Sequence, residues 1–218
     1  MLLAVDTSTQ TMGIALRSEH QILSEMVGKT RHFHTVELAS AVDRMLKRQG
    51  LGPGDLKALG VALGPGSFTG LRIGLAFIKG IAYARQIPIV GIPTLDITAA
   101  GLPTDPERDL VALLGAGRGR LAAGWFRSTQ EGWVSSGEPQ NLTPDQLLEK
   151  LSGPTLLSGE IPEELYRRIP DRVGVRTVPP AQAVRRPAVL ADLAWKRWTA
   201  GLSDDPTSLS PIYLQRGS

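Results

Sequence analysis

The chain has 218 residues, a length that suits one large domain or two small lobes. Hydrophobic residues make up 42% of it, enough for a packed core and too many for a disordered chain. The lack of cysteine excludes disulfides, thiolate nucleophiles and zinc sites with cysteine ligands, and the net charge of +3 does not by itself indicate nucleic-acid binding.

The first 27 residues have the pattern of three short strands. Residues 2–6 form an apolar run that predicts a buried strand, and residues 12–17 and 22–27 predict two more. Polar turns connect these segments, so we expect an antiparallel meander. No basic segment with a long apolar run precedes the first strand, which is why we expect no signal peptide.

The most apolar stretch of the chain, residues 73–84, is too short and too interrupted to span a membrane. Gly74, Lys79 and Gly80 break it, whereas a spanning helix needs roughly 20 apolar residues. We therefore expect a soluble cytoplasmic protein without membrane contact.

Two helices are predicted in the first half, at residues 35–49 and 71–86. The first has one apolar stripe with three- and four-residue spacing, whereas apolar residues surround nearly the whole second helix. A helix that is apolar on most sides must be covered on most sides, either by its own lobe or by another chain. We interpret the two helices as an apolar surface for a partner. Its predicted contact residues are Val36, Ala39, Val42, Met45, Leu46, Leu71, Leu75, Ile78 and Ala82.

The second half repeats the order of strands and helices of the first half. A segment with Pro103 and Pro106 separates the two, so we predict an N-terminal lobe at residues 1–102 and a C-terminal lobe at 103–218. The repeated order predicts two related α/β lobes. The expected strands are 58–63, 87–92, 110–114, 121–127, 133–137, 155–158 and 173–178, and the further helices are 94–100, 144–151, 162–169 and 187–200.

Two turns are candidates for binding a phosphate group. Asp6, Thr7 and Ser8 follow the first strand, where a carboxylate and hydroxyls can hold a metal–phosphate group or simply satisfy the turn's own backbone. The glycine-rich turn at 64–70 leads into a helix, whose N-terminus attracts anions. Its glycines can equally serve the backbone dihedrals, with Thr69 as the N-cap residue. The candidate residues of this second turn are Gly64, Gly66, Ser67, Thr69 and Gly70.

Histidines and cations give weaker indications of a metal site and of a surface that contacts phosphates. His32 and His34 are two residues apart, whereas a helical metal pair needs a spacing of three or four, so we predict no metal site. Eight cations lie between residues 165 and 200, which indicates either a solvated helical face or a surface that contacts phosphates. They are Arg167, Arg168, Arg172, Arg176, Arg185, Arg186, Lys196 and Arg197.

The sequence resembles the TsaB (YeaZ) family over the whole chain. The resemblance rests on the string Gly-Pro-Gly-Ser-Phe-Thr-Gly-Leu-Arg-Ile-Gly at residues 64–74, the opening Ala-Val-Asp-Thr-Ser at 4–8 and the ending at 211–216. It implies an α/β, actin-like (ASKHA, ribonuclease H-like) fold of two lobes, each with a mixed sheet flanked by helices. Members of the family serve the formation of threonylcarbamoyladenosine at position 37 of tRNAs that read codons starting with A.

The resemblance also implies a non-catalytic role. The chain is expected to bind and activate the catalytic subunit TsaD, with TsaE joining the assembly, to form a homodimer when alone and to meet tRNA only through the complex. It implies no catalytic residue and no cofactor, with any ATP at a subunit interface, so that the two candidate turns are a vestigial phosphate loop. The alternative is a nucleotide-binding ATPase or phosphotransferase of the actin-like superfamily. Residues 117–121, Gly-Arg-Gly-Arg-Leu, depart from the family's pattern.

Overall fold

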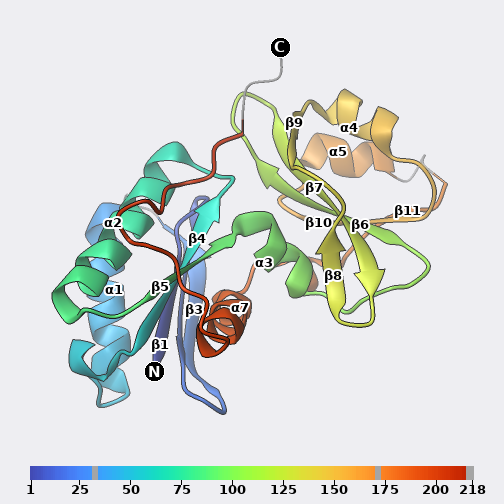
Figure 1. Cartoon of the computed structure of the whole chain (residues 1–218). Helices are drawn as coiled ribbons and strands as arrows, with labels where there is room; N and C mark the ends of the chain where they lie inside the picture. Colours follow the sequence, from blue (N-terminus) through green and yellow to red (C-terminus); the bar gives the residue numbers. More distant parts are fainter. Residues whose placement is uncertain (31–33, 170–172, 215–218) are drawn as a thin grey trace. The chain divides into compact units, whose positions relative to one another are not determined.

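The computed structural model describes residues 1–30, 34–169 and 173–214 and consists of two α/β units (Figure 1). Unit 1 contains residues 1–94 and 186–212, and unit 2 contains residues 95–185 and the C-terminal residues from 213. The predicted two-lobed α/β architecture is thus present. The predicted division into 1–102 and 103–218 is corrected, because the last helix returns to unit 1.

Unit 1 is built on a five-stranded sheet with the order β3-β2-β1-β4-β5. The first three strands form the predicted antiparallel meander, and β4 and β5 are parallel to β1. The strands are β1 (Leu2–Asp6), β2 (Thr11–Arg17), β3 (Ile22–Lys29), β4 (Ala58–Gly64) and β5 (Ile89–Pro93), and a 3-10 turn, η1 (Pro53–Asp55), precedes β4.

Helices cover both faces of this sheet (Figure 1). Helices α1 (His34–Arg48) and α2 (Phe68–Arg85) pack over large side chains such as Leu3, Val5 and Leu59. Helix α7 (Pro187–Thr199) packs on the other face, where Ala4 and Gly60 are paired neighbours in the sheet. A Cβ atom added at Gly60 would lie 2.9 Å from that of Ala194. Side chains alternate between the faces of a strand, so one face receives large residues and the other receives small ones that admit a close helix.

The segment 203–212 completes unit 1. The Asp204 N–H donates to the Ile89 carbonyl over 2.8 Å, and the Gly91 N–H donates to Asp204 Oδ2 over 2.7 Å. Farther along, the Ile212 N–H donates to the Leu63 carbonyl over 2.7 Å. The segment thereby satisfies backbone groups at the edge strand β5, which would otherwise be open to pairing with another chain.

Unit 2 is built on a sheet with the order β11-β10-β6-β7-β8, and β9 pairs with β7. Helices α4 and α5 pack over Val111 and Leu113, whereas α3 lies over the alternate residues Leu110 and Ala112. The short β9, α6 and η1 were not predicted. The elements are α3 (Thr94–Ala100), β6 (Asp109–Gly115), β7 (Leu121–Thr129), β8 (Gly132–Ser135), β9 (Gln140–Leu142), α4 (Pro144–Lys150), β10 (Thr155–Gly159), α5 (Glu163–Arg168), β11 (Val175–Thr177) and α6 (Pro180–Ala183). Within the described ranges, no helix is long and apolar enough to cross a membrane.

Candidate functional site

The structure brings the two candidate phosphate-binding turns together. The turn after β1 lies against the turn between β4 and α2, and Asp6, Thr7 and Ser8 are all buried. The Ser67 N–H donates to the Ser8 carbonyl over 2.6 Å, and the Thr7 hydroxyl donates to the Gly70 carbonyl over 2.7 Å. The spatial proximity of the two motifs is therefore a feature of unit 1 itself.

These turns are packed closely against each other at two glycines. A Cβ atom at Gly66 would lie 2.2 Å from the Ser8 carbonyl oxygen, and one at Gly70 would lie 2.1 Å from the Thr7 carbonyl oxygen. Asp6 Oδ1 accepts hydrogen bonds from the Ser8 N–H and hydroxyl over 2.8 and 2.5 Å. The geometry favours the alternative in which these residues serve the turns.

The glycines and the helix cap of this junction have separate roles. Gly64 has a φ of 112°, which only glycine adopts readily, whereas Gly66 and Gly70 are required for close approach. Ser67 is the N-cap of α2, since its hydroxyl accepts from the Gly70 N–H over 3.2 Å. The predicted cap, Thr69, is wrong, because the helix begins at Phe68, three residues earlier than predicted.

The structure corrects most of the predicted partner-contact residues. Val36 and Ala39 are exposed. The other seven are buried: Val42, Met45, Leu46, Leu71, Leu75, Ile78 and Ala82. They are covered by the chain itself, because α2 lies on the sheet beside α1, and Leu209 of the segment 203–212 packs against the same core. These seven residues are buried within unit 1, and a contact to another chain would have to use different side chains.

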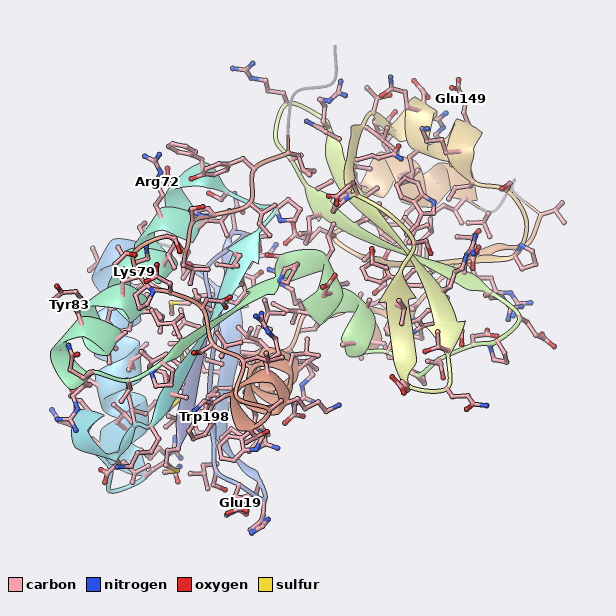
Figure 2. All side chains as sticks on the ribbon, in the orientation of Figure 1. Glu19, Arg72, Lys79, Tyr83, Glu149 and Trp198 are labelled. Carbon is pink, nitrogen blue, oxygen red and sulfur yellow. The ribbon has the colours of Figure 1, made fainter. Side chains whose placement is uncertain are left out.

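An exposed apolar groove does lie along α1 and α2, with a volume of about 500 Å³. Phe68 is 54% exposed, Ala39 and Ala76 are exposed, and Ile73 and Phe77 are half-buried. The Arg72 guanidinium lies 3.9 Å from the centre of the Phe68 ring, and Figure 2 shows Arg72 on the outer side of α2. The residues that line this α1/α2 groove are Leu38, Ala39, Phe68, Thr69, Arg72, Ile73, Ala76 and Phe77.

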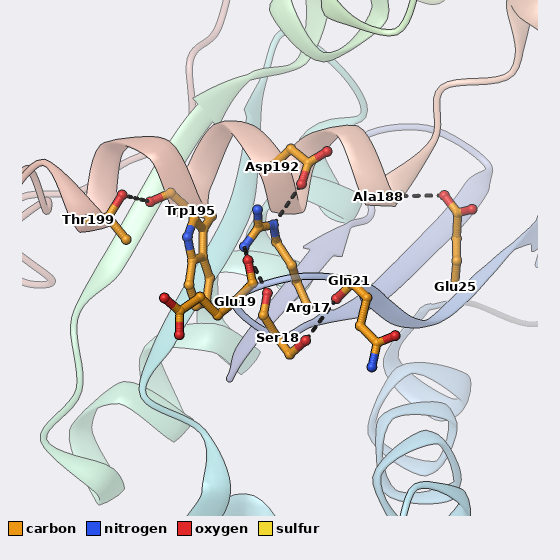
Figure 3. A network of polar contacts seen from close by, with 9 residues as sticks. All are labelled: Arg17, Ser18, Glu19, Gln21, Glu25, Ala188, Asp192, Trp195 and Thr199. Carbon is orange, nitrogen blue, oxygen red and sulfur yellow. Dashed lines mark hydrogen bonds and ion pairs between the residues drawn. The ribbon is translucent and has the colours of Figure 1, made fainter.

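A polar network attaches the start of α7 to the sheet of unit 1 (Figure 3). The Arg186 guanidinium binds the Glu25 carboxylate, and the Ala188 N–H donates to Glu25 Oε1 over 3.0 Å. Burial raises the pKa of Glu25, but the hydrogen bonds from Arg186 and Ala188 outweigh it, so the pKa is lowered. Nearby, Arg17 Nε donates to Asp192 Oδ1 over 2.7 Å.

The predicted basic stretch contains residues of both units. Its residues divide between the two units at 185/186, and Arg172 lies outside the described residues. Arg186 binds Glu25, and Arg197 donates to Asp204 and to the Gly91 carbonyl. In unit 2, Arg167 pairs with Glu163, and Arg168 pairs with Asp145. Contact between this stretch and tRNA stays a prediction.

The histidines provide no candidate site in the described part of the chain. His20 is exposed, with its Nε2 atom 3.9 Å from Glu19. The side chains of His32 and His34 lie outside the described residues. Over residues 1–30, 34–169 and 173–214, no cluster of three or more histidine, aspartate or glutamate side chains could hold a metal ion.

Comparisons with known proteins identify the family. The family model "TsaD: tRNA N6-adenosine threonylcarbamoyltransferase" matches residues 21–163. The tRNA threonylcarbamoyladenosine biosynthesis protein TsaB of Bacillus subtilis is 31% identical, over 98% of this chain and 93% of the relative. The chain belongs to the TsaB family. A tRNA N6-adenosine threonylcarbamoyltransferase of Nitratidesulfovibrio vulgaris is 32% identical, but over 51% of this chain and 34% of that enzyme.

A solved structure has the same fold. It is a Pseudomonas aeruginosa protein described as similar to the peptidase YeaZ, with a TM-score of 0.80 and 24% identity, covering 98% of this chain and 99% of that one. The TsaB chain described here accordingly has the predicted two-lobed α/β fold. Its candidate functional surface is the α1/α2 groove, whereas its turns at residues 6–8 and 64–70 pack closely against each other.

Proposed function

We propose that the chain is a non-catalytic subunit in the biosynthesis of tRNA threonylcarbamoyladenosine, and that it binds and activates TsaD through the α1/α2 groove. The modification is the one at position 37 of tRNAs that read codons starting with A, and TsaE joins the assembly. The observation that carries the proposal is the groove, where apolar side chains of α1 and α2 remain exposed after unit 1 has folded. Exposed apolar surface of this kind is typical of sites for protein contacts.

The relation to the transferase supports TsaD as the partner. The TsaD family model covers residues 21–163, a range that includes both α1 and α2. A lobe of TsaD related to unit 1 would carry helices equivalent to α1 and α2. If the two lobes pair, the α1/α2 surfaces of both chains can be buried in one interface. The same geometry would allow a homodimer when TsaD is absent.

The close packing of the turns at residues 6–8 and 64–70 supports the non-catalytic part of the proposal. In an ATPase or phosphotransferase, the Asp6 carboxylate and the turn at 64–70 would have to face a nucleotide. Here Asp6 accepts two hydrogen bonds from Ser8, and backbone atoms of the two turns are in contact. We take these hydrogen bonds as support for a structural role of the two turns.

Aspartate substitutions in the groove test the docking surface. Ala76→Asp and Ala39→Asp change exposed residues, so the fold should persist, but a docked partner would have to bury an unpaired carboxylate. We expect at least about a hundredfold weaker binding of TsaD, measured by calorimetry, because such a charge costs several kcal/mol. Ala200→Asp at the C-cap of α7 is the matched control, since this residue is exposed and α7 packs on the opposite face of the sheet. Binding of TsaD at full affinity by both groove variants would refute the proposal.

A further inference from the structure

Strand β3 is a long edge strand of the unit 1 sheet. The other edge strand of this sheet, β5, is covered by the segment 203–212. The edge strands of unit 2, β8 and β11, have four and three residues, whereas β3 has eight. Short or covered edges accept another strand poorly. Among the edge strands of the described residues, β3 therefore offers the most backbone for pairing with another chain.

The second half of β3 has backbone groups that point out of the sheet. The Thr30 N–H donates to the Gln10 carbonyl over 3.0 Å, so alternate residues back from Thr30 bond to β2. The backbone groups of Glu25, Val27 and Lys29 point the other way. Val27 is 39% exposed, and Lys29 is exposed as well. Within the described ranges, β2 is the one strand that pairs with β3, so the outer groups are accessible to a strand of another molecule.

We propose that β3 pairs with the β3 strand of a second copy of this chain, antiparallel and centred on Val27, so that the two five-stranded sheets join into one. In this register Glu25 of each copy lies opposite Lys29 of the other, and Val27 lies opposite its own counterpart. Residues whose backbone groups face each other in this way exchange both N–H···O bonds. Main-chain hydrogen bonds provide the affinity when a strand is added to a sheet edge.

The charges along β3 favour a second copy in this register. The Glu25 carboxylate accepts from the Ala188 N–H of α7, and side chains alternate along a strand, so Val27 and Lys29 lie on the same face as Glu25. A register centred on Glu25 would place two carboxylates opposite each other, which is destabilising. The register centred on Val27 instead places a carboxylate opposite an ammonium group on both sides of the centre. An exposed ion pair adds little affinity, so it selects the register while the backbone provides the attraction.

The proposal goes beyond the proposed function and does not depend on it. A pair through β3 uses an edge of the sheet, whereas a pair through the α1/α2 groove would use the surface assigned to TsaD. The two modes of self-association predict different crosslinks between single introduced cysteines. Because the chain has no cysteine of its own, every crosslink can be assigned to the introduced residue.

Cysteine crosslinking of the full chain tests the pair and its register. The two Val27 Cα atoms would be about 5.5 Å apart, within the range of a disulfide, so Val27→Cys should give a covalent dimer on a non-reducing gel after mild oxidation. Gly28→Cys is the matched control, because Gly28 would lie opposite Met26 and the two introduced thiols would be too far apart to join. Its added Cβ meets no atom within 4 Å. Ala76→Cys, exposed in the α1/α2 groove, reports the alternative pairing.

Val27→Pro tests the backbone hydrogen bonds. Proline removes the N–H group that points outwards at the centre of the pair and leaves the N–H groups that bond to β2. We expect at least about tenfold weaker self-association, measured by analytical ultracentrifugation, because the central hydrogen bonds are lost. Val27→Thr keeps the N–H group and the β-branched side chain and should self-associate like the wild type. Circular dichroism shows whether each variant is folded, and the crosslinking decides alone if Val27→Pro is not.

Several outcomes would overturn the proposal. One is a Val27→Cys variant that stays uncrosslinked or that crosslinks no more readily than Gly28→Cys, since the latter would indicate random collisions. Another is a folded Val27→Pro variant that self-associates as tightly as the wild type. A crosslink at Ala76→Cys without one at Val27→Cys would place the pair at the groove instead. None of these measurements contains TsaD, so they are independent of the binding tests of the proposed function.

Discussion

At the scale of single residues, three glycines hold the family-typical turns together. Gly66 and Gly70 give the Ser8 and Thr7 carbonyl oxygens the space that a Cβ atom would occupy, and Gly74 does the same for the Thr7 hydroxyl. Gly66 and Gly70 belong to the turn that the sequence offered as a phosphate site. Composition alone cannot tell a glycine that admits a ligand from one that admits another backbone segment.

Replacement of Gly70 by alanine tests this role. The added methyl group would lie 2.1 Å from the Thr7 carbonyl oxygen, so the two turns must separate, and we expect a loss of about 1–3 kcal/mol in the free energy of unfolding. Gly80→Ala is the matched control on the same helix, because no atom lies within 4 Å of its added Cβ. The free energy of unfolding of that variant should rise by up to about 1 kcal/mol, because alanine has a higher helix propensity than glycine. Urea denaturation measures both, and equal stability of the two variants would contradict the packing role.

At the scale of elements, helix α2 shows what hydrophobic periodicity could and could not predict. The pattern predicted the existence of the helix. Its all-round apolar character predicted cover on most sides, but within the chain the buried residues of α2 form one stripe, and Phe68 and Tyr83 are exposed. The pattern could not tell which neighbour covers which side. Leu75 and Ile78 face the core of unit 1, whereas the half-buried Ile73 and Phe77 line the groove. Only the three-dimensional position of α1 and of the segment 203–212 distinguishes these stripes.

The attachment of α7 to the sheet leads to a prediction with a pH dependence. Glu25 accepts from Arg186 and from the Ala188 N–H at the start of α7, and Glu25→Gln removes the charge from both interactions. We expect a loss of about 1–3 kcal/mol in the free energy of unfolding at pH 7. Because the folded pKa of Glu25 lies below its usual value of 4.5, this contribution is present above pH 4.5 and disappears as the pH falls through the folded pKa.

Thermal unfolding of wild type and variant between pH 3 and 7 measures this difference. Glu19→Gln is the control, because the Glu19 side chain is exposed and lies 3.9 Å from His20. It should leave the free energy of unfolding nearly unchanged at every pH. A deficit of Glu25→Gln that stays constant down to pH 3 would show that the carboxylate charge does not stabilise the start of α7.

At the scale of the whole molecule, the sequence predicted the two lobes but not how the chain is shared between them. The proline-rich segment near residue 103 suggested a simple division, since composition marks exposed linkers well. Composition cannot show that a C-terminal segment packs on the N-terminal lobe. Helix α7, more than 90 residues after β5 in sequence, covers the small-residue face of unit 1 around Gly60. In the local sequence, the only sign of such a contact between distant segments is the small residues that make room for it.

Fragments of the chain test this shared architecture. A fragment of residues 1–102 is the lobe that the sequence predicts, yet it lacks α7 and the segment 203–212. Its sheet would expose the face around Ala4 and Gly60 and the edge of β5, so we expect aggregation or no cooperative unfolding. A second fragment joins residues 1–94 to residues 186–214 by a flexible glycine–serine linker. It contains α7, which covers the sheet face, and the segment 203–212, which covers the edge of β5, so it should unfold cooperatively. Circular dichroism during heating measures the difference. A cooperative transition of fragment 1–102 alone would show that unit 1 is complete without its C-terminal segment, since the sheet would then be stable with one face uncovered.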